Sequence, residues 1–110
     1  PDWIADTIRQ RAEAHGVSPW LLLAIIDCES RFDPYAEGDR DRRGRPRSHG
    51  LIQLNDQATG LLWHFLDVGY TSPYSVWHSA DYLALVAAGE WADDGVTLRR
   101  WSCYRIVMGR

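Results

Sequence analysis

The sequence predicts an all-α domain with about five helices. Apolar residues recur at intervals of three and four along most of the chain, which is typical of amphipathic helices. Ser-Pro pairs and glycines divide these stretches into helix-sized segments. No strong strand pair and no internal repeat is evident. The 110 residues are expected to form one domain over residues 1–110.

Two helices are predicted in the first third of the chain. Asp2 can cap the first helix, and Gly16 stands where a helix stop belongs. Its buried face has apolar residues at intervals of four: Ile4, Ile8 and Ala12. The second helix begins at Ser18-Pro19, a capping residue followed by Pro at the first helical position. Residues 20–26 are all apolar, so this helix should be central and buried, and it should run on through Ser30 before Asp33-Pro34 breaks it.

The middle of the chain combines a charged loop with a third helix. Residues 37–47 contain five Arg and three acids without apolar periodicity, which indicates a loop. Residues 48–54 can begin as a short extended segment, and Asn55 or Asp56 can cap the helix that follows. The apolar stripe of that helix consists of Ala58, Leu61, Leu62, Phe65 and Leu66.

Two more helices are predicted after a turn around Gly69. Ser72-Pro73 again reads as a cap and a first helical Pro, and the helix should end near Gly89. Its buried stripe consists of Val76, Ala80, Leu83 and Ala87. After a turn at residues 93–95, Thr97 can cap the last helix. One face of the last helix carries Trp101, Tyr104 and Met108.

Composition and spacing exclude several classes of protein. The net charge of −3 argues against a nucleic-acid binder such as a helix-turn-helix protein. The Arg content alone would fit such a protein, since all twelve basic residues are Arg. The longest apolar run has seven residues, too few to span a membrane. The four His and two Cys do not have metal-ligand spacing, so we expect no metal site and no cofactor.

Glu29 is the carboxylate with the most informative position. It stands at the C-terminal end of the most apolar helix, directly before a polar loop. An apolar environment and the negative end of the helix dipole both favour the protonated form and raise the pKa of a carboxyl group. A carboxylic acid that stays protonated near neutral pH can act as a general acid. The alternative is that Glu29 is only a solvated residue at a helix end.

Several motifs resemble the catalytic domain of lytic transglycosylases, a family related in fold to goose-type lysozyme. Residues 15–26 lead into and include the buried helix that begins at Ser18-Pro19. Residues 29–36 read Glu-Ser-Arg-Phe-Asp-Pro-Tyr-Ala, and residues 50–53 read Gly-Leu-Ile-Gln where the family has Gly-Leu-Met-Gln. Residues 101–104 resemble the approach to a Tyr-Asn motif, with Arg105 in the place of Asn. The resemblance implies a compact lysozyme-like helical domain that cleaves peptidoglycan.

The resemblance also implies a role for individual residues. Glu29 would protonate the oxygen that links N-acetylmuramic acid to N-acetylglucosamine, and would then act as base while a 1,6-anhydro sugar forms. Ser30, Gly50, Gln53 and Tyr104 would contact the substrate or position Glu29. The alternatives are a solvated residue at a helix start for Gln53, a core aromatic for Tyr104 and an ordinary C-terminal helix residue for Ser30. The substrate would be the glycan strands of peptidoglycan.

Two other functions stay open at this point. In a goose-type-like hydrolase, a second carboxylate activates water, and Asp39 or Asp41 in the charged loop can supply it. These acids can instead simply offset the loop Arg residues. Arg105 in place of Asn also leaves open a non-catalytic wall-binding or structural module.

The two cysteines, Cys28 and Cys103, directly precede Glu29 and Tyr104. If Glu29 and Tyr104 meet across a cleft, as the resemblance implies, the cysteines can come close enough for a disulfide. Two buried thiols are the alternative. The resemblance further implies action in the periplasm, in the cell wall or from a phage particle. We expect a monomeric domain from a larger protein.

Overall fold

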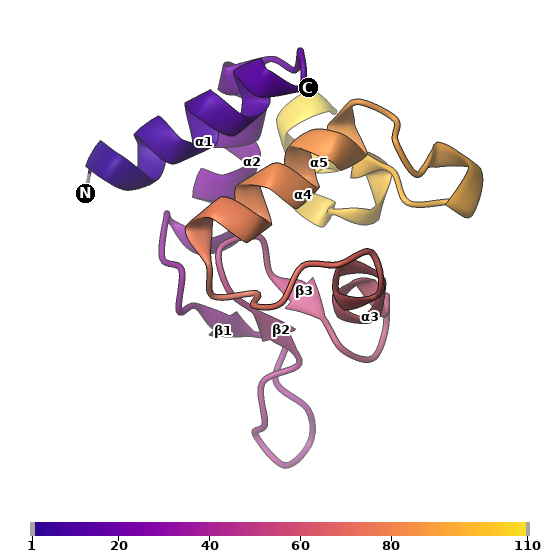
Figure 1. Ribbon diagram of the computed structural model, residues 1–110. Coiled ribbons are helices and arrows are strands. Elements are labelled where there is room, and N and C mark those ends of the chain that lie inside the picture. The colour runs from indigo at the N-terminus through magenta and orange to yellow at the C-terminus, as the bar shows by residue number, and fades with distance from the viewer. Residues whose placement is uncertain (1, 110) are drawn as a thin grey trace.

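The computed structural model describes residues 2–109, and it confirms a mostly α-helical, lysozyme-like domain. Figure 1 shows the helices above and beside a small sheet, with one long loop projecting away from the sheet. The described residues form five α-helices: α1 (Asp2–Ala14), α2 (Pro19–Ser30), α3 (Leu61–Asp67), α4 (Val76–Ala87) and α5 (Ser102–Met108). Two short 3₁₀ helices, η1 (Ala92–Asp94) and η2 (Leu98–Arg100), lie between α4 and α5.

The core lies where α1, α2 and α4 pack against one another. Figure 1 shows α4 crossing in front of α5. Helix α2 also contacts α5. The three residues predicted for the buried face of α1 are buried, as are Leu22, Ile25 and Ile26 of α2, whereas Leu21, Leu23 and Ala24 are half-buried. Trp20 is an exception to the prediction for residues 20–26, because its side chain is 65% exposed at the N-terminal end of α2.

α1 begins at Asp2, the first described residue, and α2 begins and ends as predicted. Ser18 caps α2, and its Oγ accepts the N–H of Leu21. The helix ends at Ser30 because Arg31 and Phe32 both adopt the left-handed conformation, with φ of 56° and 63°. This sharp turn comes directly before Asp33-Pro34. It leaves Glu29 in the last turn of α2.

A small antiparallel sheet is the main departure from the predicted helices. Its strands are β1 (Glu37–Gly38), β2 (Ser48–His49) and β3 (Leu54–Asn55), in the order β1-β2-β3. Glu37 pairs with His49, and Ser48 pairs with Asn55. Each strand has two residues, too few to show the alternation by which strands are recognised in a sequence. The charged loop is therefore a long connection between β1 and β2.

Two predicted helix starts are wrong because the polar residues cap turns instead. Ser72 accepts the N–H of Tyr74 in a turn, and α4 begins only after Ser75, whose Oγ accepts the N–H of His78. Asn55 lies in β3, and its Oδ1 accepts two N–H groups of the following loop, so α3 starts later, after Gly60.

The last predicted helix is divided in two. Thr97 precedes the 3₁₀ helix η2, and α5 begins at Ser102. Trp101 is buried, with 3% of its surface exposed, whereas Met108 is 52% exposed and does not share the buried face expected for it.

A buried acid joins the first and fourth helices. Asp81 on α4 accepts hydrogen bonds from Arg11 Nε (2.9 Å) and Tyr70 Oη (2.7 Å), and it contacts His15 Nε2 at 2.7 Å. Burial alone raises the pKa of Asp81, but these hydrogen bonds outweigh burial and hold that pKa below its ordinary value. The ionised carboxylate of Asp81 therefore ties α1 to α4.

None of the helices within residues 2–109 has the length and hydrophobicity needed to cross a membrane. The same part of the chain holds no cluster of His, Cys, Asp or Glu suited to a metal ion.

Candidate active site

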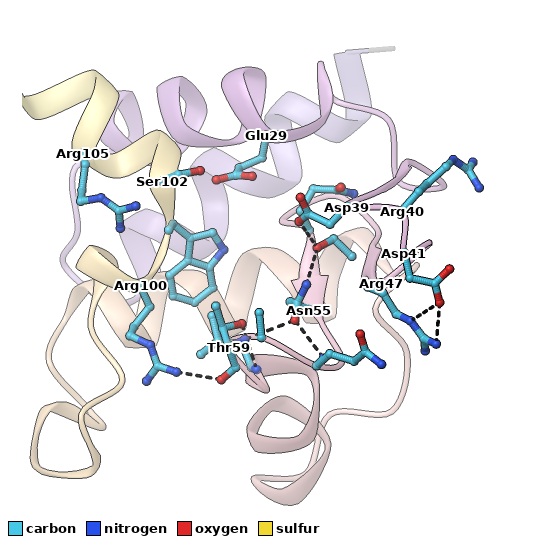
Figure 2. A pocket seen from close by; sticks show the side chains of 16 residues that line it. Glu29, Asp39, Arg40, Asp41, Arg47, Asn55, Thr59, Arg100, Ser102 and Arg105 are labelled. Atoms are coloured by element: carbon cyan, nitrogen blue, oxygen red, sulfur yellow. Dashed lines mark hydrogen bonds and ion pairs between the residues drawn. The ribbon is translucent and has the colours of Figure 1, made fainter. Parts of the chain in front are cut away.

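A pocket of about 410 Å³ lies between the helices and the small sheet. Figure 2 shows Glu29 reaching into it from α2, with Ser102 and Arg105 of α5 on one side and Asp39 and Asn55 on the other. The pocket thus brings together a helix end, a sheet and the last helix, which are far apart in the sequence.

Glu29 is half-buried in this pocket. Its Oε2 accepts the backbone N–H of Cys103 at 3.3 Å. Burial raises the pKa of Glu29, and the nearby charge of Asp39 adds to the rise, whereas the Cys103 N–H and the charge of Arg105 oppose it. The net result is a pKa above the ordinary value, so more of the acid is protonated near neutral pH. This is the direction that its position at the end of an apolar helix predicts.

A disulfide joins the two elements that meet at Glu29. Cys28 on α2 and Cys103 on α5 are bonded, with a Cα–Cα distance of 5.8 Å. Because Cys28 directly precedes Glu29 and Cys103 donates to it, the bridge fixes α5 beside the carboxylate.

Asp39 lines the same pocket on the sheet side. Its Oδ2 accepts the hydroxyl of Ser48 at 2.5 Å, and the Ser48 oxygen in turn accepts Asn55 Nδ2 at 3.0 Å. Ser48 and Asn55 are buried, so the carboxylate is anchored to the middle and edge strands of the sheet.

Asp41, the other candidate for a second carboxylate, has a different role. It accepts the backbone N–H groups of Arg43 (2.8 Å) and Arg45 (3.0 Å) and forms an ion pair with Arg47 (2.9 Å). Hydrogen bonds from the Arg45 and Arg43 backbone and from the Arg47 side chain hold the pKa of Asp41 below its usual range, although burial opposes them. Asp41 therefore organises the turn of the charged loop.

Gln53 lines the pocket, but its amide nitrogen is used within the protein. Nε2 donates to the carbonyls of Ala36 (3.0 Å) and Gly50 (2.9 Å), and the backbone of Gln53 is left-handed, with φ of 52°. The side chain thus holds the loop after α2 against the segment between β2 and β3. Its Oε1 stays at the pocket side, close to Gly38.

Three residues expected at the site do not line this pocket. Ser30 is buried, and its hydroxyl donates to the Ile26 carbonyl as an ordinary last-turn helix contact. A Cβ on Gly50 would lie 2.0 Å from the carbonyl oxygen of Pro73, so the close approach that this glycine permits is to the chain itself. Tyr104 faces a separate hollow beside Val86 and Leu98 on the other side of α5.

Other pocket residues carry no role in the sequence-based prediction. Trp101 forms part of the wall, and its Nε1 donates to the buried Ile52 carbonyl at 2.8 Å. Arg100 donates to the Thr59 carbonyl at 2.8 Å and so ties η2 to the loop before α3. Arg100 and Trp101 lie close to Cys103 in the sequence. Once the disulfide to Cys28 is known, this closeness predicts that both residues lie near Glu29.

The comparisons with known proteins agree with this geometry over the first part of the chain. The family model described as "Transglycosylase SLT domain" matches residues 6–82, which include the Glu29 and Gln53 walls of the pocket. The wall formed by residues 100–105 lies outside the matched segment. Searches of curated proteins and of solved structures each returned no match.

Proposed function

Because this chain belongs to the transglycosylase SLT domain family, which comprises peptidoglycan-cleaving lytic transglycosylases, we propose that Glu29 is its general acid and base. The bond cleaved is the β-1,4 linkage between N-acetylmuramic acid and N-acetylglucosamine. The observation that carries this proposal is the half-buried carboxyl group of Glu29 in the pocket, with a pKa above its ordinary value.

The proposed reaction needs one carboxyl group. Protonated Glu29 gives its proton to the glycosidic oxygen as the bond from that oxygen to C1 breaks. The 6-hydroxyl of the same muramic acid residue then forms a bond to C1, and the Glu29 carboxylate takes the hydroxyl proton. The products are a 1,6-anhydro end and a free 4-hydroxyl, and Glu29 is protonated again. The attacking hydroxyl belongs to the substrate, so proximity replaces activation of a water molecule.

Hydrolysis with inversion is the second candidate reaction, and one observation keeps it in view. Asp39 lines the same pocket as Glu29 and is anchored through Ser48, so it is available as a base for water. Asp41 does not support this reaction, since its carboxylate is committed to Arg47 and two backbone N–H groups.

Digestion of purified peptidoglycan, followed by mass spectrometry, tests the proposal. The wild type should release fragments with 1,6-anhydro ends, and Glu29→Gln should be slower by about 10²–10⁴-fold, the usual contribution of a general acid. Asp27→Asn is the matched control, because Asp27 is an exposed acid on the same helix and lies outside the pocket. Equal cleavage by wild type and Glu29→Gln would overturn the role of Glu29.

The products also separate the two reactions. Reducing ends, lost in Asp39→Asn, would favour hydrolysis with Asp39 as base. Anhydro ends that persist in Asp39→Asn would favour the transglycosylase. No cleavage by the wild type, with retention on the wall, would indicate a binding module.

The substrate determines where the domain works. Peptidoglycan-acting domains of this family function outside the cytoplasm. We propose the periplasm, the cell wall or a phage particle as the compartment. A disulfide beside the site supports an oxidising location.

A further inference from the structure

Two links connect α2 and α5 at the same point. The first is the disulfide between Cys28 and Cys103, and the second is the hydrogen bond from the Cys103 N–H to Glu29 Oε2. Cys103 takes part in both. The residue that closes the covalent bridge is therefore also the hydrogen-bond donor to the proposed catalytic carboxyl group.

We propose that the Cys28–Cys103 disulfide is a positioning element for Glu29, so that opening it lowers the activity of a domain that stays folded. This inference rests on the proposed role of Glu29 as general acid. Cys28 and Cys103 act through Glu29 and do not themselves need to touch the substrate.

The packing of α5 explains why the bridge is needed. The helix has seven residues, and Cys103 is its single buried residue within the described chain. Ile106 and Met108 are each about half exposed, and the partly buried Tyr104 packs against the core. No side-chain cap fixes the N-terminus of α5. The disulfide therefore adds a covalent restraint on the orientation of α5 toward α2, at the buried residue of that helix.

The neighbouring structure explains why the domain should survive without the bridge. Trp101, directly before α5, is buried and donates to the Ile52 carbonyl at 2.8 Å. α1 packs against both α2 and α4, so these three helices make core contacts of their own, and α5 packs on them through α2. Opening the bridge is thus expected to release α5 while the pocket wall at Trp101 stays in place.

Release of α5 would change Glu29 in two ways. The carboxylate loses the N–H that orients it, and the charge of Arg105, also on α5, moves away. Both groups favour the ionised form, whereas burial, which favours the protonated form, also falls when α5 leaves the pocket, so the pKa of Glu29 changes. Misorientation lowers the rate of proton transfer, whereas the pocket walls on the sheet keep their own contacts.

Reversible reduction of the wild type provides the test. Cys28 is exposed, so a dithiol reductant can reach the bridge. Dithiothreitol gives two electrons and two protons to the disulfide, which yields two cysteine thiols and the cyclic disulfide of the reagent. Rates on soluble peptidoglycan fragments are measured before reduction, after reduction and after reoxidation, with circular dichroism recorded at each stage.

We expect kcat to fall by about 10- to 100-fold on reduction, the usual effect of a small misplacement of a catalytic group. KM should change less than kcat does, the alkaline limb of the pH profile should move, and reoxidation should restore all three. The double variant Cys28→Ser/Cys103→Ser should behave like the reduced wild type and should not respond to dithiothreitol.

Other outcomes are equally clear. If the reduced, folded wild type keeps its kcat and its pH profile, the bridge serves stability alone and the inference is wrong. If Glu29→Gln is as active as the wild type in the oxidised state, the proposed function fails instead. If the reduced wild type and the double variant both lose their folded circular dichroism signal, the bridge is required for folding and the inference is wrong.

Discussion

The contact between Gly50 and Pro73 gives a stability prediction with a matched control in the same chain. Gly50 has φ of 83°, and a Cβ there would lie 2.0 Å from the Pro73 carbonyl oxygen and 2.8 Å from its carbon. Gly16 also has a positive φ, 69°, but nothing lies within 4 Å of a Cβ at that position. Gly16→Ala therefore measures the cost of the backbone conformation, and Gly50→Ala adds the steric cost.

The two costs can be estimated separately. A left-handed backbone costs a residue with a Cβ roughly 1–2 kcal/mol, and an atom forced into packed space costs about 1–3 kcal/mol more. We expect Gly16→Ala to lower the free energy of unfolding by about 1–2 kcal/mol and Gly50→Ala by about 2–5 kcal/mol. In a domain of this size the difference of about 1–3 kcal/mol lowers Tm by roughly 5–20 °C.

Urea unfolding and thermal melts, followed by circular dichroism, measure both variants. Equal losses of stability in Gly16→Ala and Gly50→Ala would refute the steric argument. Gly50 would then be free to face the substrate, as the sequence alone suggests. A larger loss in Gly50→Ala, with normal cleavage by the folded fraction, would assign this glycine to packing.

Three further predictions concern other parts of the molecule. Asp81→Asn should cost about 2–3 kcal/mol at neutral pH, because hydrogen bonds to a charged group are lost. The pKa of Asp81 is depressed by folding, so this difference from the wild type should shrink as the pH falls below about 4 in urea titrations. Trp101→Phe removes the donor to the Ile52 carbonyl and should cost about 2 kcal/mol in the same assay. Arg105→Gln removes a charge that lowers the pKa of Glu29, so the alkaline limb of kcat/KM should move to higher pH; an unmoved limb would contradict this coupling.

Local signals predicted the helices well where the capping residue had a single role. Ser18-Pro19 starts α2 because the Ser18 side chain is free to accept the Leu21 N–H. Ser72-Pro73 has the same two residues but fails, because the Pro73 carbonyl accepts the Ser79 hydroxyl and packs against Gly50. That contact is between residues far apart in the chain, so the dipeptide alone does not predict it.

The site was predictable only in part, for a similar reason. Glu29 could be identified from its place at the end of an apolar helix, because that property is local. The roles of Asp39 and Asp41 could not be distinguished, because they depend on which turn the loop forms and on the pairing of Arg47 with Asp41. Tyr104 lines the separate hollow and not the pocket of Glu29. Consecutive residues of a helix point about 100° apart, so the residue at which α5 begins, Ser102, decides which side Tyr104 faces.

The wall that α5 and η2 give to the pocket has a practical consequence for anyone who trims or transplants this domain. A shortened version that ends after α4 keeps Glu29 but loses the pocket wall that η2 and α5 form. It also strips Trp91 and Trp101 from the rings around the fully buried Tyr82. Cys28 would become an unpaired surface thiol, open to cross-linking between copies. The shortest version of the domain that retains the complete pocket therefore extends through α5.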